Sequence, residues 1–186
     1  PPYHAHAFAG ALAVIYNAGV KENAGIFSQS QGWIILAEAL RGHGGRAFRY
    51  FLENAPAAQN DRAEIRKLEP YCYGQFTEGK ASPHFGRSHV HWLTGTASTV
   101  MVGCVEGILG MRPDFCGLRI APAIPKAWEG FTIEKVFRGC KLHIVVKNPN
   151  HAESGFTEMK VNGKVMPDNY VSAELLTENT EIELTL

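Results

Sequence analysis

The sequence predicts an α+β chain organised by segment, helical over residues 1–112 and built of β strands over residues 113–186. Three observations favour this fold class. Apolar residues recur at helical spacing in the first segment, and they alternate at period two in the second. The pair Asn162-Gly163 is typical of a two-residue hairpin turn. We therefore expect one helical domain followed by a small antiparallel β-sandwich module.

Several helices are expected along the first segment. One begins near Ala11, and a polar loop over residues 19–25 follows it. The next two form a hairpin that Gly42 interrupts and Pro56 ends, and the last helix opens at Thr94. The apolar stripes expected to face the core are Trp33, Leu36, Ala37 and Leu40, then Ala47, Phe48, Phe51 and Leu52, then Ala97, Val100, Met101, Cys104, Val105 and Ile108.

Residues 57–90 form a long polar and aromatic stretch without clear periodicity, which is typical of a functional segment or of one packed against another part of the protein. The strands come later in the chain. Those expected span residues 131–137, 141–147, 157–161 and 180–186.

Composition argues against several partners. The 18 basic and 18 acidic side chains give a net charge of zero, so a nucleic acid or an anionic membrane surface is not expected to bind. No apolar run approaches the roughly 20 residues of a membrane span. The four cysteines are scattered without a CxxC pair. We expect them to be reduced core thiols of a cytoplasmic protein.

The expected helices do not make a closed bundle by themselves, because long polar loops join them whereas bundle connections are usually short. We expect this chain to be the C-terminal piece of a longer polypeptide whose other helices complete the core and the site.

An anion site is predicted where the last helix of the first segment begins, at Thr94-Gly95-Thr96. Free amide groups, the positive end of the helix dipole and two hydroxyls favour phosphate there, and Gly95 lets a ligand approach the backbone. The alternative is that Thr94 or Thr96 simply caps the helix, which is the commoner role of threonine at this position.

Two loops combine charged or amide groups with aromatic residues, Lys21-Glu22-Asn23 and Glu69-Pro70-Tyr71 with Gln75. Such surfaces suit sugars, whose hydroxyls need polar partners and whose ring faces stack on apolar planes. The alternative for both loops is an ordinary solvated surface. Trp33 and Trp92 are equally consistent with core packing.

Metal binding and nucleophilic catalysis have little support. The pairs His4/His6 and His89/His91 lack a third ligand at a suitable spacing, so no metal site is predicted. No serine or cysteine triad, GxSxG elbow or P-loop occurs in the sequence.

The chain resembles the inverting glycoside phosphorylases of the cellobiose, cellodextrin, laminaribiose and chitobiose phosphorylase family. The segments that carry the resemblance are residues 19–27, 31–33, 56–57 with 60–61, 69–71 with Gln75, 92–97, 108–110 with 112–113, and 137–139. The resemblance implies that the chain is the C-terminal portion of an (α/α)6 catalytic barrel followed by a C-terminal β module.

The resemblance also implies roles for individual residues. They are Thr94 and Gly95 as the phosphate-binding pair, Lys21, Glu22 and Gln75 as ligands of the donor sugar, and Tyr16 as an aromatic residue on the acceptor side. The catalytic acid of the family is an aspartate earlier in the barrel and is not in this chain, so this piece alone is expected to be inactive. Phosphate is a co-substrate, no cofactor is implied, and a homodimer is expected.

Two positions depart from the family pattern. Gln29 replaces a phosphate-binding histidine, and it can donate a hydrogen bond but supplies no positive charge. Leu12 lies where cellobiose phosphorylases place a carboxylate that holds the acceptor glucose, so the acceptor side favours a longer or different sugar. Both departures favour a cellodextrin phosphorylase. The alternatives are a two-carboxylate glycoside hydrolase on the same barrel type and a non-catalytic carbohydrate-binding module.

Overall fold

The structure is a computed structural model that describes residues 2–3 and 12–186. The side chains of these residues are described too, except that of Leu12. The chain divides into two compact units. The first comprises Pro1–Trp33 with Tyr50–Met101, and the second comprises Ile34–Arg49 with Val102–Leu186. The predicted domain boundary near Arg112 concerns the domains of the whole enzyme, and it remains a prediction.

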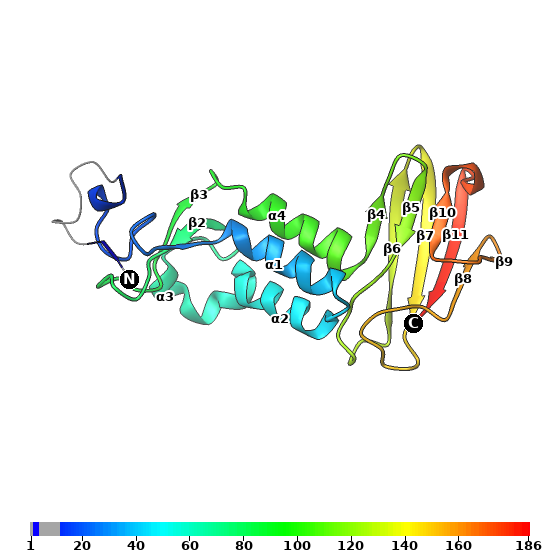
Figure 1. The fold of residues 1–186 in the computed structure, drawn as a ribbon, viewed down its shortest axis with the longest axis horizontal. Helices are drawn as coiled ribbons and strands as arrows, with labels where there is room; N and C mark the ends of the chain where they lie inside the picture. The colour runs from blue at the N-terminus through cyan, green and yellow to red at the C-terminus, as the bar shows by residue number, and fades with distance from the viewer. Residues whose placement is uncertain (1, 4–11) are drawn as a thin grey trace. The chain divides into compact units, whose positions relative to one another are not determined.

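The first unit is organised around a three-stranded antiparallel sheet in the order β1-β2-β3 (Figure 1). Its strands are β1 (Ile26–Phe27), β2 (Gly74–Thr77) and β3 (Ser88–His91). The unit also holds the 3-10 turns η1 (Leu12–Ile15) and η2 (Pro56–Arg62) and the short helix α3 (Ala63–Arg66). About half of residues 57–90 therefore lie in helical or strand elements, but each element spans at most seven residues, which is too short to register as a period.

The predicted helical hairpin is confirmed as α1 (Gln29–Leu40) and α2 (Gly44–Asn54), joined through Gly42 at φ 79°. The predicted inner face of α1 is wrong. Trp33 and Leu40 are 59% and 56% exposed, whereas Ile35 and Ala39 are buried. Because α1 is apolar on nearly every side, periodicity could not identify the face that packs within this chain.

The helix predicted from Thr94 is α4 (Thr96–Val102), which continues as a π-helical segment, η3 (Gly103–Ile108). Val100 and Ile108 are buried as predicted, but Met101 is 67% exposed. The glycines at positions 103 and 107 are buried on the helix. The closely packed face of this helix is formed by small residues. A search for large apolar residues at helical spacing does not detect them.

The second unit contains two sheets, in the orders β10-β5-β4 and β6-β7-β11-β8-β9 (Figure 1). The strands of the first are β4 (Met111–Pro113), β5 (Gly117–Ile120) and β10 (Tyr170–Ser172). Those of the second are β6 (Gly130–Phe137), β7 (Cys140–Lys147), β8 (Glu158–Val161), β9 (Lys164–Val165) and β11 (Asn179–Thr185), and a 3-10 turn, η4 (Ala173–Leu175), follows β10. The four strands predicted from alternation are confirmed as β6, β7, β8 and β11. The barrel and the sandwich stay predictions.

The larger sheet differs from the prediction in one pairing, because β11 runs parallel to β7. The long connection over residues 148–178 allows this parallel neighbour, while β8 pairs antiparallel with the other edge of β11. Alternation still places the core correctly, with Leu142, Ile144, Ile182 and Leu184 fully buried. The predicted hairpin turn is confirmed, since Asn162 and Gly163 have φ 48° and 79°.

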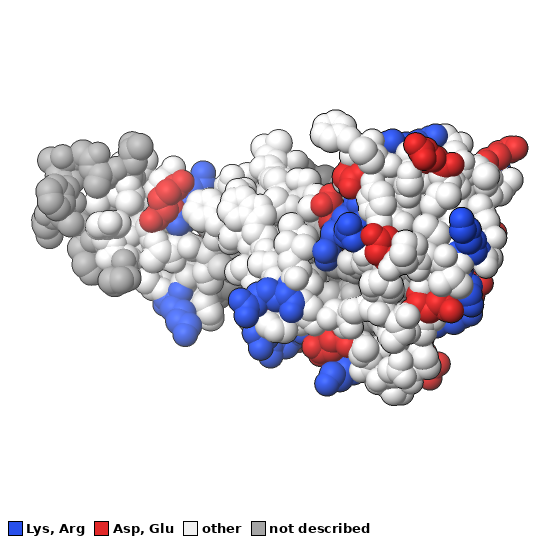
Figure 2. All heavy atoms as spheres, turned by 45° about the vertical axis from the view of Figure 1, so that its right-hand side comes forward, with Lys and Arg blue, Asp and Glu red and all other residues white. Residues whose placement is uncertain are grey.

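Acidic and basic side chains lie side by side on the second unit (Figure 2). Lys147 Nζ is 2.7 Å from Glu183 Oε2, and Lys160 Nζ is 2.7 Å from Glu158 Oε2. All four cysteines are free thiols, but Cys116 is exposed, so the expectation that all of them are core residues is wrong. Within the described part of the chain, no helix has the length and apolar character needed to cross a membrane.

Candidate functional site

The first turns of α1 and α4 are anchored on adjacent residues of β2. The Ser28 amide, just before α1, donates to the Gln75 carbonyl at 2.9 Å. The hydroxyl of Thr96, a fully buried residue, donates to the Gly74 carbonyl at 3.3 Å. Strand β2 therefore holds the beginnings of both helices in place, through the carbonyl groups of the neighbouring residues Gly74 and Gln75.

A close contact between the backbones of the two helices fixes their spacing. A Cβ atom on Gly32 would lie 2.3 Å from the carbonyl carbon of Thr99, so only glycine fits at position 32. One turn away, the Thr99 hydroxyl donates to the Gln29 carbonyl at 2.9 Å. These contacts bring the beginning of α1 against that of α4.

The three predicted phosphate-binding residues, Gln29, Thr94 and Gly95, meet at this point. A Cβ atom on Gly95 would lie 3.8 Å from Gln29 Oε1, so the Gln29 amide group faces the Gly95 backbone. The Gly95 amide has no hydrogen-bond partner among the described residues. Gly95 is also exposed, which leaves its amide accessible to a ligand.

Thr94 also performs the capping role that the sequence left open. Its hydroxyl accepts a hydrogen bond from the Thr96 amide at 3.1 Å and lies 2.7 Å from the Thr96 hydroxyl. The Thr96 amide is therefore not free, contrary to expectation. Because the Thr96 hydroxyl donates to Gly74, the single proton of the Thr94 hydroxyl goes to Thr96 Oγ1 in the free chain. Thr94 can donate to a bound anion when the Thr96 proton turns from the Gly74 carbonyl to Thr94 Oγ1.

Lys21 and Tyr16 are brought together in the loop that precedes β1. The Lys21 ammonium lies 5.5 Å from the centre of the Tyr16 ring, a cation–π arrangement. The loop is fixed at Gly19, which has φ 85° and where a Cβ atom would lie 2.5 Å from the Ser82 amide nitrogen. Glu22 is exposed on the same loop.

Asn23, which the sequence places with Lys21 and Glu22 in a candidate sugar-binding loop, instead clamps this loop from inside. The residue is 2% exposed. Its Oδ1 accepts from the Tyr3 amide at 2.6 Å, and its Nδ2 donates to the Tyr16 carbonyl at 2.8 Å. No spacing pattern in the sequence distinguishes a buried asparagine of this kind from an ordinary loop residue.

A buried carboxylate, also missed from the sequence, fixes the segment between β2 and β3. The Glu78 side chain is 6% exposed, accepts from Ser82 Oγ, and accepts from His89 Nε2 at 2.6 Å. Burial raises the pKa of Glu78, but the hydrogen bonds from Ser82 and His89 outweigh it, so the pKa lies below the ordinary value. The His89 ring also stacks on Phe76, with 5.0 Å between ring centres.

Trp92, two residues before Thr94, forms an exposed aromatic pair with Tyr71. Trp92 and Tyr71 are 66% and 69% exposed, with ring centres 6.1 Å apart. The indole Nε1 of Trp92 donates to Glu69 Oε1 at 3.4 Å. Hydrogen bonding to the Glu69 backbone amide lowers the pKa of the Glu69 carboxyl, and the Trp92 bond adds to this. Trp92 and Trp33 are therefore not core aromatics within this chain.

Other predicted residues are not joined to this group. No hydrogen bond or ion pair joins Lys21 or Tyr16 to Gln29 among the described residues. The Leu12 side chain and the pair His4/His6 lie outside the described residues. No group of three or more His, Cys, Asp or Glu side chains that could hold a metal ion occurs in the described ranges.

Comparisons with known proteins support the resemblance noted from the motifs. The model of the glycosyl hydrolase 94 superfamily catalytic domain matches residues 1–110. N,N'-diacetylchitobiose phosphorylase of Vibrio furnissii is 41% identical over 148 residues, which are 80% of this chain and 18% of that enzyme. Solabiose phosphorylase of Paenibacillus borealis is 25% identical over 186 residues, which are 99% of this chain and 24% of that enzyme.

The chain thus spans less than a quarter of the length of these relatives. The matched region covers more than half of the 186 residues and includes every residue predicted for the site. The chain belongs to the glycosyl hydrolase 94 superfamily.

Proposed function

We propose that this chain is the C-terminal part of an inverting β-glycoside phosphorylase, which cleaves a β-linked oligosaccharide with inorganic phosphate and releases a sugar 1-phosphate. The observation that carries the proposal is the meeting of Gln29, Thr94 and Gly95 at the beginning of α4. An exposed amide and a hydroxyl lie there, and such donors suit a phosphate anion. The Gln29 carboxamide, whose Oε1 faces Gly95, donates to the anion when it turns its NH2 group inward. The names of the relatives support the same activity.

In the proposed reaction a carboxylic acid protonates the glycosidic oxygen while a phosphate oxygen attacks the anomeric carbon from the opposite face. The bond from the anomeric carbon to the leaving oxygen breaks, and the leaving sugar keeps the transferred proton. This chain supplies no acid. Its part is to position phosphate and sugar, so its contribution is orientation and electrostatic stabilisation.

For the sugars, we propose that Lys21, Glu22 and Gln75 bind the donor and that Tyr16 and Leu12 border the acceptor. A β-linked gluco-oligosaccharide of the cellodextrin type, which would give α-glucose 1-phosphate, remains our substrate proposal because Leu12 offers no carboxylate to a lone glucose. The 41% identity to the Vibrio furnissii enzyme favours diacetylchitobiose as a second candidate. Comparing phosphorolysis of cellotriose, cellobiose and diacetylchitobiose side by side distinguishes the two. Phosphate as co-substrate without a cofactor, and a cytoplasmic homodimer, belong to the same proposal.

The test is Thr94→Val in the enzyme that carries this chain, with Thr94→Ser as the matched control. The valine variant loses a hydrogen bond to a charged ligand, worth about 1.5–3 kcal/mol, so the KM for phosphate should rise roughly 10- to 150-fold. The serine variant keeps the hydroxyl and should stay close to the parent. Thermal unfolding measured in parallel reports the capping hydrogen bond, which Thr94→Val loses and Thr94→Ser keeps, so that a loss of stability can be told from a loss of phosphate binding. An unchanged phosphate KM in Thr94→Val would refute the assignment.

A further inference from the structure

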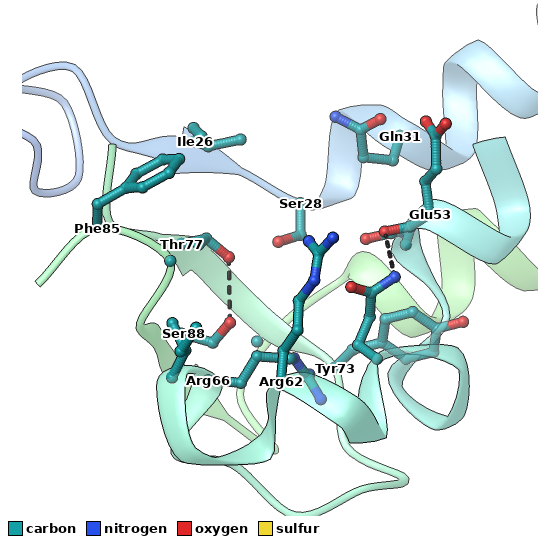
Figure 3. Close-up of a pocket in the computed structure, with 15 residues that line it drawn as sticks. Ile26, Ser28, Gln31, Glu53, Arg62, Arg66, Tyr73, Thr77, Phe85 and Ser88 are labelled. Atoms are coloured by element: carbon teal, nitrogen blue, oxygen red, sulfur yellow. Dashed lines mark hydrogen bonds between the residues drawn. The ribbon is translucent and has the colours of Figure 1, made fainter. Parts of the chain in front are cut away.

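The first unit contains a cavity of about 550 Å³ that no predicted site residue lines. It lies among the end of α2, α3 and the strands β2 and β3 (Figure 3). Gln31 lines it, whereas Gln29 faces Gly95. Residues two apart on a helix point to opposite sides, so the cavity and the phosphate-binding group lie on different faces of the first turn of α1.

The cavity is electropositive. Arg62 and Arg66 line it against a single acidic side chain, Glu53, among the described lining residues. Arg62 is exposed, has no ion-pair partner among the described residues, and projects towards Ser28 in Figure 3. Arg66 is held in place because it donates to the Cys72 carbonyl at 3.2 Å. One free and one positioned guanidinium suit a phosphate or carboxylate group.

An unsatisfied donor lies at the same cavity. Asn54, the last residue of α2, lines it, and its Nδ2 atom is buried without a hydrogen-bond partner among the described residues. A buried amide left unpaired is costly, and such groups normally have a partner. Because Nδ2 is itself covered by protein, an acceptor oxygen of a ligand in the cavity would satisfy it once the Asn54 side chain turns towards the cavity.

The other end of the cavity is apolar with hydroxyls beside it. Figure 3 shows Ile26 and Phe85 next to one another, away from Gln31 and Glu53. The hydroxyls of Thr77 and Ser88 lie 3.1 Å apart near them. An aromatic face with neighbouring hydroxyls suits a sugar ring.

From these features we infer that the cavity is a second ligand site, for a phosphorylated monosaccharide. The guanidinium groups and the Asn54 amide bind the phosphoryl oxygens, and the sugar ring lies against Phe85. A volume of about 550 Å³ is within the range of small-molecule sites. The inference does not depend on the reaction that the enzyme catalyses.

Calorimetric titration of the enzyme that carries this chain tests the inference, with glucose 6-phosphate, inorganic phosphate and glucose as probes. Glucose 6-phosphate should bind more tightly than either of the others. Arg62→Gln should weaken that binding about tenfold or more, because it removes a charge-assisted hydrogen bond. Arg87→Gln is the matched control, an exposed arginine of the same unit that does not line the cavity, and it should have no effect.

Asn54→Leu gives an independent readout. Removing the unpaired donor should raise the midpoint of thermal unfolding of the free enzyme and should weaken glucose 6-phosphate binding. Three results would overturn the inference. They are no binding of glucose 6-phosphate, equal binding of inorganic phosphate, and binding that Thr94→Val abolishes but Arg62→Gln leaves intact. The last result would assign the ligand to the phosphate group at Thr94.

Discussion

The close approach of α1 and α4 makes Gly32→Ala the sharpest structural test. The new Cβ atom would lie 2.3 Å from the Thr99 carbonyl carbon and 2.5 Å from its oxygen, where ordinary contact begins at 3.4 Å. Both clashing atoms are backbone, so the helices must part by about 1 Å, because a close-packed interior has no space to absorb the clash. Overpacking of this kind costs about 1–3 kcal/mol, and the better helix propensity of alanine returns up to about 1 kcal/mol. We expect a net loss of about 1–2 kcal/mol in the free energy of unfolding.

The same displacement should weaken phosphate binding, because it moves Gln29 away from Gly95. Urea unfolding and the phosphate KM of the enzyme that carries this chain measure the two effects. Gly95→Ala is the control, since its Cβ atom would lie 3.8 Å from Gln29 Oε1, an ordinary contact. It should leave stability unchanged but raise the phosphate KM by covering the approach to the Gly95 amide. A Gly32→Ala enzyme with parental stability and phosphate KM would refute the reasoning.

Three further predictions concern the loops and the chain itself. The pKa of Glu78 is lowered in the folded protein, so its stabilisation is present above the ordinary value of 4.5 and is lost as the pH falls through the folded pKa. Glu78→Gln should therefore lower the free energy of unfolding at pH 7 and reduce its dependence on pH below 4.5, as measured by urea unfolding across this range. Asn23→Leu leaves the Tyr16 carbonyl unpaired and should cost about 1–3 kcal/mol in the same assay, whereas a neutral effect would show that the clamp is dispensable. The chain produced by itself should release no sugar phosphate from oligosaccharides, and measurable release by it would contradict the assignment of the acid to another part of the enzyme.

Helix and strand positions were predictable where the chain carries strong local signals. Glycine and proline end α1 and α2, Asn162-Gly163 sets the hairpin turn, and period-two alternation marks β7 and β11. The buried face of α1 was not predictable, because a helix that is apolar all round gives no preferred direction. The short strands around residues 74–91 were not predicted, because they depend on pairing with partners distant in the sequence rather than on a local pattern.

The candidate site, like the fold, was only partly predictable from the sequence. Thr94 and Gly95 were recognisable from the chemistry of a helix beginning, but only the fold places Gln29 beside them, some 65 residues away in the sequence. Glu78 gave no signal and the structural role of Asn23 was missed, because a buried polar side chain is identified by its partners and not by its neighbours in sequence. The exposed face of Trp33 likewise follows from tertiary packing.

The proposed phosphate chemistry is tested most directly by following the products of oligosaccharide cleavage with ³¹P and ¹H NMR, in the presence and absence of inorganic phosphate. The enzyme that carries this chain should cleave the β-linked substrate only when phosphate is present. The product should be a sugar 1-phosphate of α configuration, because inversion of a β linkage requires it. Cleavage at the same rate without phosphate, with free sugar as the only product, would contradict the proposal and identify a hydrolase instead.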